Sequence, residues 1–419
     1  MQVRANGTHG DDNEMRLIYV TSSFPFGQGE AFILPELESL LRLGHELLVV
    51  PLWPHGGVVH DDAARWLNRA SSEPLISFEI GSSIVTEFSK GSRRIARLLG
   101  LFTDTNPLIA LKNFAVLPKA AWLAEKALAW RAEHIHAFWA STVATLAMGA
   151  SELSGIPWSF TAHRFDIVQD NLFKEKARHA RFVRFISESG FRMAGLVGTD
   201  LEQKSEVLHL GVDLWDSVPE ANHNQRPVAL CAASFVPVKA HGVLIEAVDR
   251  LCRRGIPLEL WLAGDGELSD DLRHEVERRG LANCVKFLGV LSHNTLMKLY
   301  ASGAVDIAVL ASTDLGHGLH EGIPASLMEA MSFGVPVIGT ATGGVPELLA
   351  GGAGLLVPPQ DPAVLANALQ LLSQNIRVRE SVGEAGRKRI KESFAAMKIA
   401  SEMARLFSTV PDSALIKAS

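Results

Sequence analysis

Short apolar runs alternate with longer amphipathic segments along most of the chain. In the first half, runs rich in valine, isoleucine and aromatic residues predict buried strands. These runs are residues 16–22, 46–53, 134–139, 158–163 and 182–189. Between them, segments such as 36–43 repeat apolar residues every three or four positions, which is the period of helices packed on a sheet. This order of strands and helices predicts a doubly wound α/β domain.

The same rhythm restarts after the polar stretch 217–227. Further strands are predicted at residues 228–234, 258–264, 284–289, 306–312 and 335–340, and a helix at 243–254. The chain is therefore expected to form two doubly wound α/β domains. Because parallel sheets bind ligands at the carboxyl ends of their strands, we expect the site in the cleft between the two facing sheets.

The predicted domain limits follow from this pattern. Residues 1–14 form a polar N-terminal arm, 15–222 the N-terminal domain and 223–395 the C-terminal domain. Residues 396–419 form a C-terminal helix, able to pack back on the N-terminal domain, and a polar tail.

Composition is that of a folded globular protein. The chain has 419 residues, a hydrophobic fraction of 47% and a charged fraction of 21%. Its net charge of −6 gives no electrostatic reason to expect nucleic-acid binding. The three cysteines (Cys231, Cys252 and Cys284) fit buried thiols in a reducing compartment, and their spacing does not suit a zinc site.

No apolar run reaches the roughly 18 residues needed to span a bilayer. The N-terminus also lacks a hydrophobic secretion segment, so we expect a cytoplasmic protein. Residues 90–97 are basic, and lysines recur in the apolar segment 114–130. The region 90–131 is either a solvated basic helix face or a surface for peripheral contact with the inner face of the membrane.

Two carboxylates, Glu321 and Glu329, stand eight positions apart at the end of a predicted strand. Pro324 at a first helical position and Gly334 after the last one predict a helix of about ten residues. Glu321 then lies in the loop before this helix, where a ligand would lie. The amides of residues 323–326 at the helix start form a ready anion site.

Amides that donate to phosphate and carboxylates that accept from sugar hydroxyls together describe a nucleotide-sugar pocket. Spacing alone also fits an acid that stabilises a helix dipole, accompanied by a solvated glutamate. Other segments of the chain bear on this choice.

The stretch EGIPASLMEAMSFGVPVIGT, followed by GGVPELL at 343–349, closely resembles glycosyltransferase family 4, in particular its exopolysaccharide-assembly branch. Further similar segments follow in the family's order over roughly residues 16–410. They are SSFPFGQGEAFILPELESLLRLGHELLVV, IHAFWAS, PWSFTAHRFDI, HLGVDL, KAHGVLIEA, LAGDGEL and VKFLGVLSHNTLMKLYASG. The resemblance implies a GT-B fold, in which two Rossmann-like domains face each other across a cleft. The N-terminal domain would bind the acceptor and the C-terminal domain the nucleotide sugar.

The resemblance also implies residue roles. Glu321 matches an acid that meets donor-sugar hydroxyls, and Glu329 one that binds the nucleotide ribose. Lys239 matches a lysine that neutralises the diphosphate, and His163 a histidine that contacts the donor sugar near the reacting centre. The segment from Gly322 through Ile323 and Pro324 to Ala325 would present backbone amides to the sugar or diphosphate. The base would be held at Val290 and Leu291.

Several of these positions also have a structural explanation. Asp166 either orients the loop after His163 or caps a turn. Gly27 and Gly29 lie on the loop after the first strand, which would close over the phosphates or receive the acceptor, or is an ordinary glycine turn. Gly343 and Gly344 make a strand-to-helix turn and could also contact phosphate or sugar.

One position departs from the family pattern. The family usually carries an arginine five residues before the lysine, as a second diphosphate clamp, and here that position is Ser234. Three explanations are open. Lys239 and the helix amides suffice, or Arg164, His241 or another base supplies the charge, or the chain is a weak or inactive relative.

The family retains configuration at the anomeric carbon, which requires no protein nucleophile. No Asp-x-Asp pair is present in the sequence, so neither a metal nor another cofactor is demanded. A dinucleotide oxidoreductase is disfavoured, because residues 264–266 do not complete the G-x-G-x-x-G fingerprint. We expect a retaining glycosyltransferase that moves a hexose from a nucleotide-diphosphate sugar to a glycan or lipid-linked acceptor. A GT-B sugar-nucleotide epimerase and a non-catalytic sugar-nucleotide-binding partner subunit are the alternatives.

Overall fold

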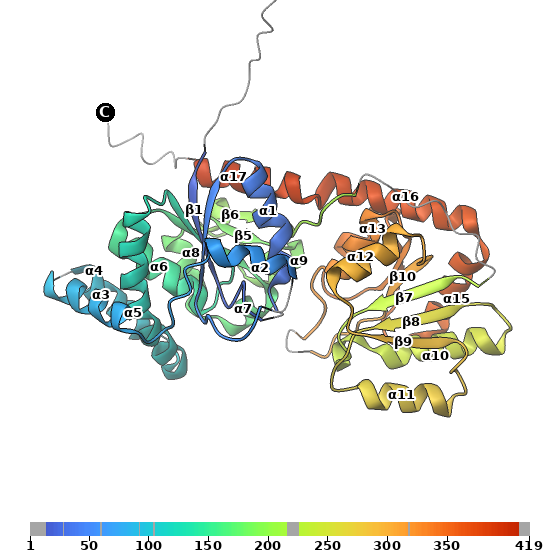
Figure 1. Ribbon diagram of the computed structural model, residues 1–419. Coiled ribbons are helices and arrows are strands. Elements are labelled where there is room, and N and C mark those ends of the chain that lie inside the picture. The colour runs from blue at the N-terminus through green and yellow to red at the C-terminus, as the bar shows by residue number, and fades with distance from the viewer. Residues whose placement is uncertain are drawn as a thin grey trace, which may run out of the picture.

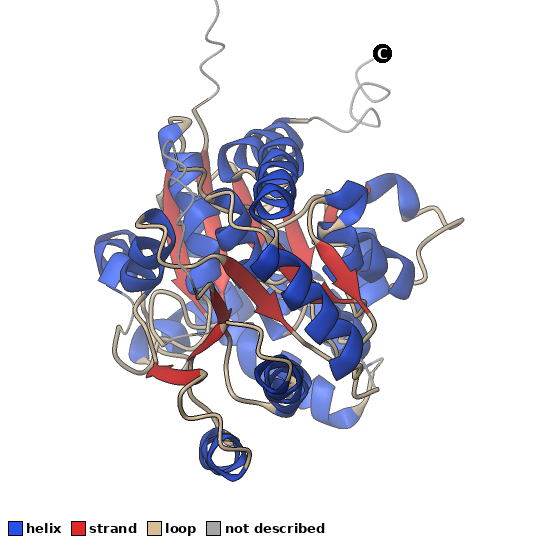
Figure 2. Cartoon of the chain, turned by 90° about the vertical axis from the view of Figure 1, so that its right-hand side faces the viewer, coloured by secondary structure: helices blue, strands red, loops and turns tan. Residues whose placement is uncertain are grey.

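The chain forms two α/β lobes connected side by side, as a computed structural model shows (Figure 1). The structure describes residues 14–27, 29–58, 61–91, 93–103, 105–215, 226–316 and 319–409. Helices lie on both faces of the strands in each lobe (Figure 2). Residues 1–13 of the expected arm (1–14) and most of the expected linker (217–227) fall outside the described residues.

The N-terminal lobe is built on a parallel sheet with the strand order β2-β1-β3-β4-β5-β6. Its strands are β1 (Arg16–Thr21), β2 (Glu46–Pro51), β3 (His134–Ala137), β4 (Trp158–Ala162), β5 (Val183–Phe185) and β6 (Ser205–Val207). Its helices are η1 (Ala31–Ile33), α1 (Leu34–Arg42), α2 (Asp61–Ala64), η2 (Arg65–Arg69), α3 (Phe78–Ser89), α4 (Arg93–Thr103), α5 (Pro107–Ala129), α6 (Thr142–Ser154), α7 (Arg164–Gln169), α8 (Phe173–His179), α9 (Glu188–Met193) and η3 (Glu202–Lys204).

The C-terminal lobe repeats this plan with the strand order β12-β11-β10-β7-β8-β9. Its strands are β7 (Val228–Ala232), β8 (Glu259–Ala263), β9 (Val285–Gly289), β10 (Ile307–Leu310), β11 (Val337–Thr340) and β12 (Leu355–Val357). Its helices are η4 (Pro237–Lys239), α10 (His241–Arg253), α11 (Ser269–Arg278), α12 (His293–Ala301), α13 (Ala325–Ser332), α14 (Val345–Leu348), η5 (Ala350–Gly352), α15 (Pro362–Gln374) and α16 (Ile376–Ser393). The predicted doubly wound α/β architecture of both halves is confirmed.

The strand predictions are wrong mainly at the sheet edges. The strands β6 and β12 were not predicted, because each has three residues and is only partly buried. The predicted strand at 182–189 is too long. Ser187 leaves the sheet there, and its hydroxyl accepts from the amide of Gly190 to cap α9.

The last described helix, α17 (Ala396–Ser408), packs on the N-terminal lobe against α1 (Figure 1). Its apolar residues Ala400, Met403 and Phe407 belong to the core around β1 and α1. At the first residue of α17, the amide of Ala396 donates to the carbonyl of Val212 at 2.9 Å. A Cβ on Gly211 would lie 2.6 Å from Cα of Ala396, so this crossing between the lobes requires glycine.

Part of the region 90–131 is not the solvated basic face that the sequence suggested. Lys119 on α5 is buried, and its ammonium group donates to the carbonyls of Pro51, Leu52 and Glu73 at 2.8, 3.0 and 2.6 Å. Burial lowers its pKa to about 8. Lys119 therefore ties α5 to the loop after β2.

Of the cysteines, Cys231 is buried as expected, whereas Cys252 and Cys284 are only half-buried. The sulfur atoms of the latter two lie 2.7 Å apart, and all three cysteines are free thiols. Within the residues that the structure describes, no helix is both long and apolar enough to cross a membrane.

Candidate active site

The loop between β10 and α13 carries the first of the two predicted acids. Strand β10 ends at Leu310, and the loop brings Glu321 to the carboxyl edge of the C-terminal sheet. Pro324 is the N-cap of α13 rather than its first residue, so the helix has eight residues instead of about ten. Gly334 follows the helix with a φ of +75°, as expected for a residue just past a helix end.

Glu321 is held by two partners in its own lobe. Its Oε2 lies 2.5 Å from Nζ of Lys239, and Oγ of Ser312 donates to the same oxygen at 2.9 Å. Lys239 lies on η4, after β7, and both side chains are partly exposed. The structure thus brings together the predicted acid and the predicted cation at the ends of neighbouring strands, with Ser312 as a partner that the sequence did not single out.

The turn at Gly343 and Gly344 supports this loop from behind. A Cβ on Gly343 would lie 1.7 Å from the carbonyl oxygen of Glu321, and its φ is +53°. A Cβ on Gly344 would lie 2.6 Å from the side chain of Ile323. Both glycines are therefore required for backbone packing against the Glu321 loop.

Arg164 reaches this loop from the opposite lobe. It is the first residue of α7, and its guanidinium group donates to the carbonyl of His320. Burial lowers its pKa, and the charges of Glu321 and Asp314 raise it. An N-terminal-lobe cation thus lies beside the C-terminal-lobe acid, across the cleft.

Ser234, which stands where the resembling family usually has an arginine, faces solvent. Ser234 is exposed, in a loop whose neighbours pack tightly against the glycines of LAGDG. His241 does not replace the cation, because burial and the charge of Lys239 lower its pKa to about 4. Its ring is buried against Phe235, and neither ring nitrogen has a hydrogen-bond partner among the residues that the structure describes.

Glu329 faces a different part of the cleft. Nε2 of His293 lies 3.2 Å from Oε1 of Glu329, and this bond raises the pKa of His293. Both residues line a cavity of about 170 Å³ whose other walls include Phe32 and Pro35 of the N-terminal lobe. The two acids therefore have different partners, although both lie at the interface of the lobes.

His163 and Asp166 are buried beneath the N-terminal wall of the site. Nε2 of His163 lies 3.0 Å from the carbonyl of Phe138, and burial lowers the pKa of His163 to about 3. Asp166 accepts from the amides of Ala140 at 3.0 Å and His163 at 3.4 Å. Asp166 therefore caps the turn at the start of α7, one of the two alternatives that the sequence offered, and its bond to Ala140 ties this turn to the loop after β3.

Lys176 is a buried partner of this loop that the sequence did not reveal. Its ammonium group donates to the carbonyls of Ala140 and Ser141 at 2.9 and 2.7 Å. Burial lowers its pKa to about 7, and burial raises that of Asp166 to about 6. The opposite charges stabilise each other under the segment that carries His163 and Arg164.

The loop after β1 is organised by Glu30, which the sequence analysis missed. Its carboxylate accepts from the amides of Ser22, Ser23 and Phe24 at 2.9, 2.5 and 2.7 Å, and from the indole of Trp139. The sequence did contain a signal for this role, because an acid that follows a glycine-containing loop can accept from the unpaired backbone amides of that loop.

The two glycines of that loop differ from each other. Gly27 has a φ of +72° and donates to the carbonyl of Gly57 at 3.0 Å. Gly29 has open space around the position of a Cβ. Gly27 is therefore required for the turn, whereas the packing around Gly29 does not require glycine.

The remaining predicted base-binding positions lie after β9. Val290 is exposed and Leu291 packs partly against the C-terminal core. Within the described residues, no group of three or more histidine, cysteine or acidic side chains has the arrangement of a metal site. The cations that face Glu321 are Lys239 and Arg164.

Two facing Rossmann-like lobes, with an acid and a lysine at the carboxyl edge of the second sheet, define a GT-B glycosyltransferase. Residues 216–389 match the model of the family of glycosyl transferases group 1. The chain is a glycosyltransferase, similar to enzymes of exopolysaccharide biosynthesis.

The relatives and solved structures agree with this assignment. The amylovoran biosynthesis glycosyltransferase AmsK of Erwinia amylovora is 25% identical over 91% of this chain and 96% of its own length. The putative colanic acid biosynthesis glycosyltransferase WcaL of Escherichia coli is 30% identical, but the match spans only 49% of this chain and 51% of that protein. HepE of Anabaena, crystallised with UDP, is 17% identical with a TM-score of 0.71 over 94% of this chain and all of that one. The last comparison supports the fold.

Proposed function

We propose that this chain transfers a hexosyl residue from a nucleoside-diphosphate sugar to a hydroxyl group of a glycan or lipid-linked acceptor, with retention of anomeric configuration. The observation that carries the proposal is the Lys239–Glu321 pair at the carboxyl edge of the C-terminal sheet, which Arg164 approaches from the other lobe. Cations suit a departing diphosphate, and a carboxylate suits sugar hydroxyls.

In this proposal the bond between the anomeric carbon and the diphosphate oxygen breaks as the acceptor oxygen bonds to the same face of that carbon. The proton of the acceptor hydroxyl passes to the departing diphosphate oxygen. No protein nucleophile takes part. The chain's contribution is to hold donor and acceptor together and to stabilise the charge that develops on the diphosphate.

Residue roles follow the partners that each side chain has. Lys239 and the first amides of α13 would bind the diphosphate, and binding of donor would draw Lys239 away from Glu321. Glu321 would then accept from sugar hydroxyls and Glu329 from the ribose. Gly322, Ile323, Pro324 and Ala325 would line the diphosphate, and Val290 and Leu291 the base. His163, neutral and buried, would contact the sugar only through the edge of its ring that faces away from Phe138.

We infer that Arg164 supplies the charge that Ser234 does not. Lys239 supplies one cation of the expected pair, and His241, whose pKa is lowered to about 4, is neutral near pH 7. Arg164 is the remaining cation beside the acid, and it comes from the lobe that must close on the donor. An arginine in this place makes diphosphate binding depend on closure of the cleft.

A donor-binding and transfer assay tests these roles together. Purified protein is first screened by thermal shift against a panel of nucleotide sugars, because a true donor stabilises the folded state. With the donor found, Lys239→Ala should weaken its binding by about tenfold or more, since a charge-assisted bond is lost. Glu321→Gln should abolish transfer and leave the fold intact. Undiminished transfer by Glu321→Gln would remove that residue from the reacting site.

The proposal that Arg164 replaces the arginine absent at position 234 is tested by a separate set of variants. Arg164→Ala should weaken donor binding and transfer, and Ser234→Arg in that background should restore much of both. Ser234→Arg alone is the matched control and should add little. If Arg164→Ala binds the donor as tightly as the unmodified chain, the role passes to Lys239 and the helix amides.

We also propose peripheral membrane contact by the α3–α5 face of the N-terminal lobe. Helices α3 and α5 pack together, and the segments that begin them expose Ile76, Phe78, Leu108 and Leu111, with Phe78 91% exposed. Basic residues at 90–97 lie between these helices in the sequence. Exposed apolar and basic side chains suit an anionic bilayer. Phe78→Ser/Leu108→Ser should reduce sedimentation with anionic vesicles, and unchanged sedimentation would refute the contact.

A further inference from the structure

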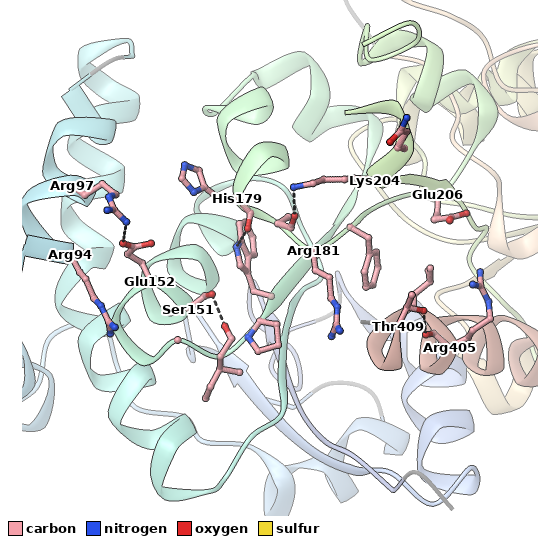
Figure 3. A pocket seen from close by; sticks show the side chains of 18 residues that line it. Arg94, Arg97, Ser151, Glu152, His179, Arg181, Lys204, Glu206, Arg405 and Thr409 are labelled. Carbon is pink, nitrogen blue, oxygen red and sulfur yellow. Dashed lines mark hydrogen bonds and ion pairs between the residues drawn. The ribbon is translucent and has the colours of Figure 1, made fainter. Parts of the chain in front are cut away.

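A second, basic pocket lies on the N-terminal lobe, away from the cleft (Figure 3). Its volume is about 940 Å³. The walls include Trp158 at the start of β4, Phe182 just before β5 and Lys204 just before β6. It therefore opens at the amino edge of the sheet, whereas the candidate active site lies at the carboxyl edge.

The pocket is built from elements that are distant in the sequence. Arg94 and Arg97 come from α4, and Arg181 from the turn before β5. Arg405 comes from α17, the helix that follows the C-terminal lobe and returns to the N-terminal one. Figure 3 shows these side chains around a common opening. A ligand in this place would contact the N-terminal lobe and α17 together.

Its charge is opposite to that of the chain as a whole. Five lining residues are arginine or lysine (Arg94, Arg97, Arg181, Lys204 and Arg405) and two are acidic (Glu152 and Glu206), an excess of three positive charges. The chain itself has a net charge of −6. Such a local excess attracts anions.

Three of these cations have no carboxylate partner among the described residues. Arg94 donates to the carbonyl of Leu153 at 2.7 Å, and Arg181 to that of Phe407 at 2.7 Å. Lys204 donates to the carbonyls of Arg178 and Ala180 at 2.8 and 3.2 Å. These bonds fix the side chains and leave N–H groups free to donate.

The two other cations are paired differently. Arg97 is bonded to Glu152 at 2.6 Å, within the pocket wall, and Arg405 to Glu402 at 2.8 Å. Burial lowers the pKa of Arg181, as expected for a cation whose charge is not balanced nearby. The unbalanced charge is thus concentrated on Arg94, Arg181 and Lys204.

We propose that this pocket binds a phosphoryl anion, a phosphate or diphosphate group, and that the bound anion fastens α17 to the N-terminal lobe. A phosphate carries close to two negative charges and three acceptor oxygens, which matches three unpaired cations better than a carboxylate does. Guanidinium groups also bind phosphate through two parallel bonds. The source of the group is a soluble metabolite or a lipid headgroup.

The site does not depend on the proposed transfer reaction, and inorganic pyrophosphate is the probe. Pyrophosphate would also occupy the diphosphate site of the cleft, so its binding is measured by calorimetry in the Lys239→Ala background of the full chain. Adding Arg94→Ala and Lys204→Ala should weaken this binding by about tenfold or more. Lys298→Ala/Lys391→Ala, which removes two exposed lysines of the C-terminal lobe, is the charge-matched control and should change little.

A measurement on the unmodified chain avoids any loss of fold in the variants. Pyrophosphate should slow amide hydrogen exchange in α17 and in the turn before β5. Protection confined to the segment around Lys239 would overturn the proposal, since the anion would then occupy only the cleft. Absence of binding, or equal weakening by the control pair, would overturn it as well.

Vesicles separate the two sources of the phosphoryl group. If Lys204→Ala, which leaves the basic residues 90–97 of the proposed membrane face intact, lowers binding to phosphatidylglycerol vesicles but not the weak binding to phosphatidylcholine vesicles, the headgroup is a lipid. If pyrophosphate binds in the pocket and the unmodified chain and the variant bind vesicles equally, the phosphoryl group belongs to a soluble molecule. Either result supports the phosphoryl site.

Discussion

The two lobes share one plan but differ in what their sheets bury. The N-terminal sheet buries a chain of polar groups, in which the hydroxyl of Ser159 lies 2.8 Å from ring nitrogens of both His134 and His136, and that of Thr161 lies 2.9 Å from the other nitrogen of His136. Beside it, Arg184 pairs with Glu36 at 2.5 Å and Tyr19 donates to Glu36 at 3.0 Å. The strands β7 and β10 of the C-terminal lobe carry only apolar side chains in their buried interiors.

This difference teaches that two sheets of equal topology can be stabilised in different ways. The C-terminal lobe relies on burial of apolar surface, which is non-directional and tolerates small shifts. The N-terminal lobe depends more on hydrogen bonds and ion pairs among its buried polar groups, although Nδ1 of His134 has no partner among the described residues, and each further loss of a partner costs free energy. We therefore expect the N-terminal lobe to respond more sharply to loss of a single partner and to acid.

The largest effect is expected for Arg184→Met. It leaves Glu36 buried without its cation, so the N-terminal lobe should lose about 3–5 kcal/mol of stability. Lobe-resolved hydrogen exchange measures this loss. Arg379→Met is the matched control in the C-terminal lobe, where the buried guanidinium bonds, within the described part of the chain, to two carbonyls at 2.7 and 3.0 Å and to no carboxylate. Equal losses in the two variants would remove the contrast.

The next effect is that of pH. Burial lowers the pKa of His134 and His163 to about 3. Between about pH 6.5 and 3 the unfolded chain therefore binds more protons than the folded one, so stability falls as pH falls. At pH 5 each histidine should cost about 2 kcal/mol relative to pH 7. Asp166, whose pKa is raised to about 6, partly offsets this loss because its folded form is the better proton acceptor.

The same lobe-resolved exchange at pH 7 and 5 tests this expectation. The C-terminal lobe buries His241, with a pKa of about 4, and should lose less. His134→Gln should reduce the pH dependence of the N-terminal lobe, whereas His55→Gln, at an exposed position, should not. A larger acid loss in the C-terminal lobe would contradict the comparison.

The smallest effects concern one glycine in each lobe. Gly343→Ala brings a Cβ into the carbonyl of Glu321 at a positive φ, so we expect a loss of about 1–3 kcal/mol and of transfer activity. Gly29→Ala meets no neighbour and should change stability by less than about 0.5 kcal/mol. Thermal unfolding and transfer assays measure both. If Gly29→Ala abolishes transfer at unchanged stability, the loop after β1 approaches a ligand closely.

Most of the fold could be predicted from the sequence, because buried strands of parallel sheets are continuous apolar runs. The strands β6 and β12 escaped prediction since an edge strand of three partly exposed residues has no such pattern. The helical period predicted α17, whereas its contact with α1 was left open, because a period does not specify the surface that a helix covers.

In the site, the family resemblance implied that Glu321 and Lys239 serve the same donor, and the structure brings their side chains within 2.5 Å of each other. Residue types and spacing did not single out Lys176, whose carbonyl partners come from a distant segment, or Glu30, whose amide partners lie in the loop just before it. A lysine among apolar residues looks like a solvated helix face until the fold supplies carbonyls for it, as at Lys119. The sequence also left the missing arginine unresolved, since only the facing of the lobes brings Arg164 to His320.

The position of α17 has a consequence for how the protein is made. The ribosome completes the strands of the N-terminal lobe well before α17, yet the apolar surface around α1 is covered only when residues 396–408 arrive. Part of the N-terminal core therefore stays exposed to water until the whole C-terminal lobe has been synthesised. A fragment that ends in the linker would lack α17, so the apolar surface around α1 would stay exposed and the fragment should aggregate. Truncation in the linker should therefore not yield a stable isolated N-terminal lobe.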